Sequence, residues 1–84
     1  MKHFRLCNND LTTNWYEHSF TNASDIIYQI EKNGFETFEI DWKTPVTGEY
    51  ATLIQVDEDN KIMFINDNFK LPKVFEKLVK KYEW

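Results

Sequence analysis

Glu36-Thr37-Phe38-Glu39-Ile40-Asp41-Trp42 is the stretch that decides the fold, because apolar and polar residues alternate along its whole length. A period of two predicts a β-strand with one buried and one solvated face. The residues expected to face the core are Phe38, Ile40 and Trp42. The residues expected to face solvent are Thr37, Glu39 and Asp41. The stretch therefore predicts a strand that rests on a core and shows carboxylates to the solvent.

Two further strands are predicted after this stretch. A turn with Pro45 and Gly48 leads to residues 50–56, and residues 61–66 come after the tetrapeptide Asp57-Glu58-Asp59-Asn60. Two apolar runs around a short polar segment predict a β-hairpin. Both runs carry apolar residues on both parities, so we expect the two strands to lie centrally in a sheet with both faces covered.

A helix is predicted before the decisive stretch. Asn22 or Ser24 can cap its N-terminus, and apolar residues then follow at helical spacing at Ala23, Ile26, Ile27 and Ile30. Gly34 stands where a left-handed residue ends a helix, and Phe35 can fold back on Ile30 in a Schellman motif. We expect this helix to stop near Asn33.

A second helix is predicted at the C-terminal end of the sequence. Pro72 suits its first turn, where a backbone N–H is not needed. An apolar stripe follows at Leu71, Val74, Phe75, Leu78, Val79 and Tyr82. The lysines fall on the remaining surface of this helix, at Lys73, Lys77, Lys80 and Lys81.

The N-terminal part of the sequence supplies two more predicted strands. Residues 2–7 alternate, and residues 14–20 can pair with them across a polar segment. The order of elements is then β-β-α-β-β-β-α. We predict one α+β domain over residues 1–84, with two helices on an antiparallel sheet of about four to five strands.

Charge divides the sequence into two parts. Residues 1–69 hold twelve Asp or Glu against five Lys or Arg, and residues 70–84 hold two against five, which gives the net charge of −4. A divided charge bears on partner choice more than on fold. The sequence therefore offers an acidic body and a basic final helix as separate candidate surfaces.

Composition and spacing argue against most enzyme and metal chemistry. His3, Cys7 and His18 are spaced unlike a compact zinc motif, and no oxyanion loop accompanies Cys7. The three carboxylates at Asp57-Glu58-Asp59 lack the pattern of an EF-hand loop. Phosphate-binding glycine loops and zinc-protease motifs are absent from the sequence. We therefore predict no catalysis, no cofactor and no metal.

The single cysteine excludes an intramolecular disulfide and fits a reducing compartment. The N-terminus offers no apolar run typical of a signal peptide, and no stretch approaches the roughly 20 apolar residues of a membrane span. We expect a cytoplasmic protein without a membrane partner.

The leading hypothesis is a protein-binding module, such as a phage-encoded antagonist of a host defence enzyme, an antitoxin or an immunity protein. Acidic surfaces complement the basic grooves of nucleic-acid enzymes, and aromatic residues supply much of the affinity at interfaces. The acids predicted to contact the partner are Glu36, Glu39, Asp41, Asp57, Glu58 and Asp59. The predicted aromatic anchors are Trp15, Tyr16 and Tyr50.

Two alternatives stay open at this stage. The first is a small nucleic-acid-associated regulator that binds through Lys73, Lys77, Lys80 and Lys81, although the acidic body disfavours it. The second is self-association through the C-terminal Tyr82-Glu83-Trp84, because a terminal tryptophan can pack between chains. The oligomeric state is not decided by the sequence.

Overall fold

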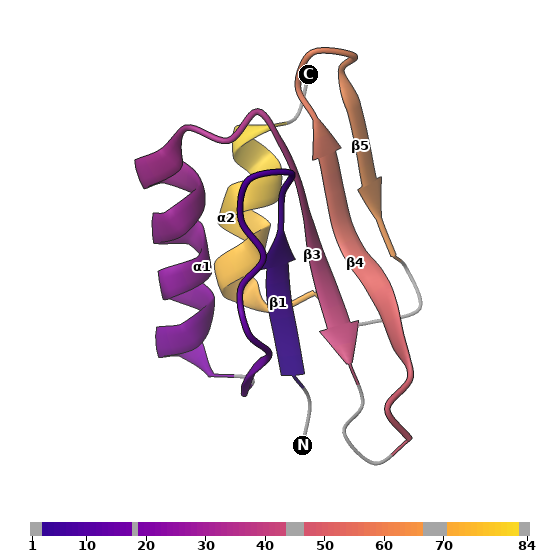
Figure 1. Ribbon diagram of the computed structural model, residues 1–84. Coiled ribbons are helices and arrows are strands. Elements are labelled where there is room, and N and C mark those ends of the chain that lie inside the picture. The colour runs from indigo at the N-terminus through magenta and orange to yellow at the C-terminus, as the bar shows by residue number, and fades with distance from the viewer. Residues whose placement is uncertain (1–2, 18, 44–46, 67–70, 83–84) are drawn as a thin grey trace.

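The computed structural model describes residues 3–17, 19–43, 47–66 and 71–82. Within them the elements come in the predicted order, as β1 (His3–Cys7), β2 (Tyr16–Glu17), α1 (Phe20–Asn33), β3 (Thr37–Lys43), β4 (Tyr50–Asp57), β5 (Ile62–Ile65) and α2 (Lys73–Lys81). One five-stranded antiparallel sheet with two helices confirms the predicted α+β fold (Figure 1). None of the helices in these ranges combines the length and the apolar character needed to cross a membrane.

The strand that the decisive stretch predicted, β3, lies at the centre of the sheet, whose order is β2-β1-β3-β4-β5. Every neighbouring pair is antiparallel. Figure 1 shows α1 and α2 next to each other on the same face of this sheet. We call the face that the helices leave uncovered the open face.

The core lies between the helices and the inner face of the sheet. Leu6, Ile40 and Ile54 form one row across β1, β3 and β4, and all three are fully buried. Aromatic rings join the sheet to α2, because Phe4 meets Phe75 edge-on with ring centroids 5.4 Å apart. Burial of apolar area on one face is the main stabilising term of such a two-layer fold.

A β-bulge interrupts the pairing of β3 with β4. Ile40 lies opposite Ile54 and Asp41 lies opposite Thr52, so Leu53 has no partner residue on β3. Leu53 and Ile54 are both fully buried, although neighbours in a regular strand face opposite sides. The bulge therefore explains the apolar residues on both parities of β4, and it leaves Tyr50 on the open face.

The prediction that both hairpin strands are central and covered on two faces is wrong. β4 lies inside the sheet, but its open face is uncovered, as the exposed side chain of Tyr50 shows, and β5 is neither central nor covered. This strand is the last of the sheet, and Ile62 and Phe64 are about half exposed on the open face. Only their neighbours Met63 and Ile65 pack against the core. Apolar composition alone does not distinguish a covered strand from an edge strand with exposed apolar side chains.

The ends of α1 are set by local hydrogen bonds. Ser19, rather than Asn22 or Ser24, is the N-cap, since its hydroxyl accepts a hydrogen bond from the N–H of Asn22. At the other end, Gly34 is left-handed with φ of 63°, and the N–H of Phe35 donates to the carbonyl of Ile30. The predicted Schellman motif is therefore confirmed.

The remaining boundaries differ little from the predictions. β2 is confined to Tyr16–Glu17, because Ser19 is already the N-cap of α1, which begins at Phe20. Pro72 occupies the N-cap of α2, and the N–H of Phe75 donates to its carbonyl. The predicted turn residue Pro45 lies outside the described residues.

Candidate functional site

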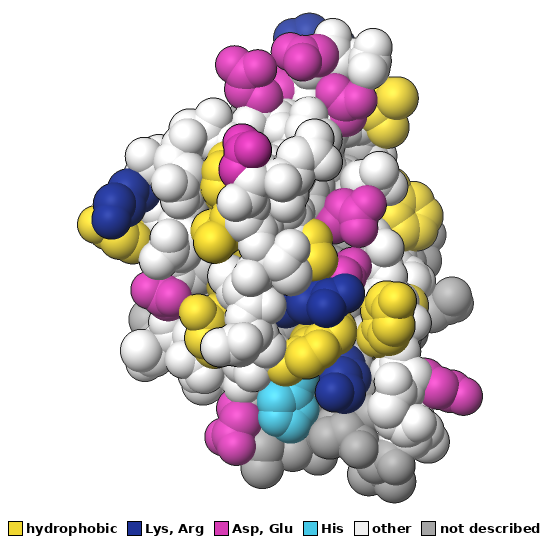
Figure 2. All heavy atoms as spheres, viewed as in Figure 1, with side chains coloured by type: hydrophobic (Ala, Val, Ile, Leu, Met, Phe, Trp, Pro, Cys, Tyr) yellow, Lys and Arg dark blue, Asp and Glu magenta, His cyan; other side chains and the backbone are white. Residues whose placement is uncertain are grey.

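The open face is the candidate site, because its side chains are not covered by the helices. Alternation along the paired strands puts on it Arg5, Cys7, Thr37, Glu39, Asp41, Lys43, Tyr50, Thr52, Gln55, Asp57, Ile62 and Phe64. Figure 2 shows Asp and Glu side chains gathered at the top of the view, over the turn between β4 and β5. Lys, Arg and hydrophobic side chains lie together in the lower half.

A polar network is fixed in the middle of the open face. The Nε of Arg5 donates to Oδ2 of Asp41 at 3.2 Å, and the thiol of Cys7 donates to the same oxygen at 3.4 Å. Burial raises the pKa of the Cys7 thiol, and the nearby carboxylate of Asp41 raises it further. Cys7 therefore stays a protonated donor at neutral pH instead of becoming a nucleophilic thiolate.

The placement of Asp41 corrects the sequence analysis. Asp41 was predicted to be a solvated contact residue, yet only 4% of its surface is exposed. A carboxylate can be buried to this extent because the guanidinium of Arg5 neutralises it from the adjacent strand. Asp41 therefore positions Arg5 and is not available for direct contact with a partner.

Aromatic rings lie around the guanidinium of Arg5. Its Cζ is 4.5 Å from the ring centroid of Trp15 and 5.5 Å from that of Tyr50, while Nζ of Lys43 is 5.3 Å from Trp15. The two rings are 6.0 Å apart. We call Arg5, Trp15, Lys43 and Tyr50 the aromatic–arginine cluster. Cation–π contacts of this kind hold both partners in a defined orientation.

The third predicted anchor, Tyr16, is placed differently. Its backbone pairs with Phe4, which is fully buried, and its side chain packs against the core. The structure therefore brings together Trp15 and Tyr50 and separates Tyr16 from them. Trp15, which directly precedes β2, contacts Arg5 and Tyr50 instead, so the two neighbouring aromatics point to different sides of the sheet.

The remaining predicted acids gather at one end of the sheet. The N–H of Glu58 donates to the carbonyl of Glu36 at 2.8 Å, which joins the β4–β5 turn to the start of β3. We call Glu36, Asp57, Glu58 and Asp59 the acidic end. Asp57 also shapes the turn, because its carboxylate accepts hydrogen bonds from the side chain and backbone of Asn60, and these bonds lower the pKa of Asp57.

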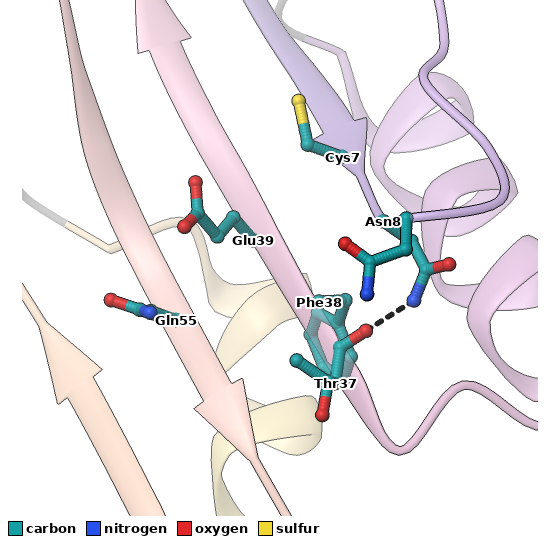
Figure 3. A pocket seen from close by; sticks show the side chains of 7 residues that line it. Cys7, Asn8, Thr37, Phe38, Glu39 and Gln55 are labelled. Carbon is teal, nitrogen blue, oxygen red and sulfur yellow. Dashed lines mark hydrogen bonds between the residues drawn. The ribbon is translucent and has the colours of Figure 1, made fainter.

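A shallow hollow of about 220 Å³ lies between the acidic end and Cys7. Figure 3 shows Glu39 and Gln55 projecting from neighbouring strands at one side, while Asn8 on the other donates a hydrogen bond to the carbonyl of Thr37. The hollow offers one carboxylate and several amides, which are groups that form hydrogen bonds with a polar partner surface. Glu39 is half-buried here, in the strand-face position that the alternation predicted.

The lysines of the alternative hypothesis lie on α2, away from the open face. Lys73, Lys77, Lys80 and Lys81 are all exposed. Lys77 and Lys81 border a groove of about 240 Å³ between the two helices, where Glu31 of α1 is also found. The carboxylate of Glu31 lowers the positive electrostatic potential near Lys77 and Lys81.

Two of the candidate metal ligands, His3 and Cys7, lie in the described part of the chain. His3 and Cys7 stand at opposite ends of β1, and His18 lies outside the described residues. Among the residues that are described, no group of three or more His, Cys, Asp or Glu is placed to hold a metal ion. Glu83 and Trp84, which the self-association hypothesis used, also lie outside the described ranges.

Among the residues of this face that sequence reasoning did not predict as contact residues are Arg5, Lys43, Ile62 and Phe64. Arg5 was visible as the polar member of an alternating strand, but its partner depends on the register between β1 and β3. Ile62 and Phe64 were interpreted as buried. A comparison of the chain with protein-family models, curated proteins and solved structures finds no match.

Proposed function

We propose that the protein is a non-catalytic module that binds another protein through its open face. The observation that carries this proposal is the distribution of exposed large hydrophobic side chains among the described residues. Three of the four, Tyr50, Ile62 and Phe64, lie on the open face, and only Tyr28 lies elsewhere, on α1. Apolar side chains concentrated on one surface favour a macromolecular contact.

The aromatic–arginine cluster supports the same surface. Trp, Tyr and Arg are the residues that most often dominate binding energy at protein interfaces. Arg5 is already held by Asp41 and by the ring of Trp15, so less conformational entropy is lost when a partner binds. The cluster is therefore suited to act as a preformed anchor.

Charge supports a basic partner. Asp41 and Arg5 neutralise each other, whereas Glu39 and the acidic end leave carboxylates at the end of the open face where Ile62 lies beside Asp57. An acidic rim speeds encounter with a basic surface and disfavours acidic ones. Basic grooves are typical of nucleic-acid enzymes. We therefore propose an inhibitor of such an enzyme, of the kind made by phages or found as antitoxins and immunity proteins, acting in the cytoplasm.

The two exposed tyrosines provide a matched test. Protein captured by cross-linking in extracts of the source cell is identified by mass spectrometry, purified, and titrated with the wild type, Tyr50→Ala and Tyr28→Ala. We expect Tyr50→Ala to weaken binding at least about tenfold and Tyr28→Ala to leave it unchanged. Equal affinities for both variants would contradict the open face as the contact surface.

A second candidate function is binding of nucleic acid through α2. The observation that favours it is that all four predicted lysines are exposed on one short helix. In a gel-shift assay, Lys73→Glu, Lys77→Glu and Lys80→Glu together should abolish salt-sensitive binding, because phosphate contacts supply that affinity. Retention of binding in the triple variant rules out this candidate. Salt-sensitive binding of nucleic acid, with no protein captured, would instead displace the first proposal.

A further inference from the structure

β5 forms one edge of the sheet, and it carries no charge within its four residues, Ile62-Met63-Phe64-Ile65. In Figure 1 none of the described elements lies beside its outer side. Edge strands are commonly protected by lysine, proline, a bulge or a covering segment, because their free peptide groups can pair with another chain. Within the strand itself β5 has neither lysine nor proline.

The direction of the peptide groups along β5 follows from one hydrogen bond. The N–H of Asn66 donates to the carbonyl of Leu53 on β4 at 2.9 Å. Because peptide groups alternate along a strand, those of Phe64 and Ile62 also point toward β4, and those of Met63 and Ile65 point to the outer edge. Two residues therefore present donors and acceptors in the geometry of a strand.

The side chains of β5 point alternately to the open face and to the core. Ile62 and Phe64 are about half exposed on the open face, whereas Met63 and Ile65 pack against the core on the helix side. A strand added at the edge would cover Ile62 and Phe64 with its own open-face side chains. Apolar residues at alternating positions of the added strand fit this arrangement.

Charge selects the kind of strand. β5 begins beside the β4–β5 turn, so one end of an added strand lies next to Asp57, Glu58 and Asp59. Lys or Arg at that end would meet these carboxylates. When two copies of β5 pair antiparallel, the Ile65 end of the second copy lies next to the acidic end and its Lys61 lies at the far end, so self-pairing brings no complementary charge to the acidic end.

We propose that the basic partner adds a β-strand to the outer edge of β5, through an extended segment with alternating apolar residues and a Lys or Arg at one end. Main-chain hydrogen bonds to Met63 and Ile65 give the affinity, and the apolar and acidic contacts give the specificity. This inference rests on the proposed function, because it names how the partner of the open face is held.

A displayed library of random peptides, each roughly ten residues long, tests this mode of binding. Met63→Pro removes an outward N–H and leaves the hydrogen bonds to β4 in place, while Met63→Ala removes the side chain and keeps the N–H. We expect selected peptides to show apolar alternation with a terminal Lys or Arg. They should bind Met63→Pro at least about tenfold more weakly than Met63→Ala.

Residue-resolved amide exchange gives a second measurement on the unmodified protein. In the free protein the amides of Phe64 and Ile62 should exchange slowly and those of Met63 and Ile65 quickly. Bound peptide should slow the amides of Met63 and Ile65 about tenfold or more. No added protection at these two amides would overturn strand addition, even if Met63→Pro fails to fold.

The outcomes separate this inference from the function on which it rests. If the captured partner loses affinity for Tyr50→Ala but binds Met63→Pro as well as Met63→Ala, the open face binds protein and strand addition is wrong. If the affinity of the partner changes with neither Tyr50→Ala nor Met63→Pro, the proposed function itself is wrong. Concentration-dependent dimers of the wild type that Met63→Pro abolishes would show that a second copy, rather than a basic partner, pairs with β5.

Discussion

The two faces of the sheet are held by different kinds of contact. On the helix side, fully buried apolar residues such as Phe4, Ile40 and Ile54 pack against α1 and α2. On the open face, Arg5, Asp41 and the rings around them form a polar and aromatic arrangement that remains partly solvated. The first face depends on burial of area and the second on the register of neighbouring strands. Substitutions on the two faces should therefore differ in how much unfolding free energy they remove.

Phe4→Ala should have the largest effect on stability. The ring is fully buried and meets Phe75 edge-on, so its loss removes apolar burial and leaves a cavity that costs about 3–5 kcal/mol of unfolding free energy. Chemical denaturation measures this change. Glu39→Ala, on the open face of the same sheet, is the control and should stay within about 0.5 kcal/mol. If both variants lost the same unfolding free energy, the helix side would not contribute more to stability than the open face.

Asp41→Ala should have an intermediate effect, because it leaves the half-buried guanidinium of Arg5 without its acceptor. We expect a loss of about 1–3 kcal/mol. A double-mutant cycle with Arg5→Ala measures the pair itself and should give a coupling of about 0.5–3 kcal/mol. A coupling of zero would show that the ion pair does not organise the open face.

The smallest expected effect is the contribution of the Cys7 thiol to the free energy of unfolding at alkaline pH. The pKa of the Cys7 thiol is raised by burial and by Asp41, so the unfolded chain releases this proton first as the pH rises. The native state then binds more protons than the unfolded state, and stability falls above the ordinary thiol pKa of about 8.5. Cys7→Ser keeps a donor to Asp41 without titrating in this range.

We therefore expect the wild type to lose more stability than Cys7→Ser between neutral and alkaline pH. Denaturation curves recorded in matched buffers measure the difference. Burial also raises the pKa of the Tyr82 hydroxyl, but that group is common to both proteins. Parallel pH profiles for the two proteins would contradict the placement of Cys7 beside Asp41.

Most of the helix side could be predicted from the sequence, because it depends on periodicity. Alternation identified Phe38, Ile40 and Trp42 as buried, and all three lie in the core. Gly34 and Phe35 ended α1 as predicted, since a left-handed residue and a local hydrogen bond are sufficient. These features depend only on residues close together in the sequence, so they can be predicted from the sequence alone.

The open face could be predicted only in part, because it depends on residues far apart in the sequence. The burial of Asp41 requires Arg5, which is 36 positions away and adjacent only in the observed register. The exposure of Ile62 depends on β5 being an edge strand, and the strand order is not encoded by local hydrophobicity. The acidic turn and Tyr50 were identified from composition, but their relation to Arg5 was not.

The bulge at Leu53 determines which face of the sheet the first residues of β4 point to. The number of residues in β4 matters here more than their type. β4 has one residue more than β3 needs between two paired positions. A deletion at this point would straighten the strand and still leave Tyr50 on the open face, at the cost of one buried leucine. An insertion of one residue between Leu53 and Asp57, paired regularly and without a second bulge, would turn Tyr50 toward the helices. Because the bulge already holds the extra residue, β4 can lose one residue at this point and keep Tyr50 on the open face.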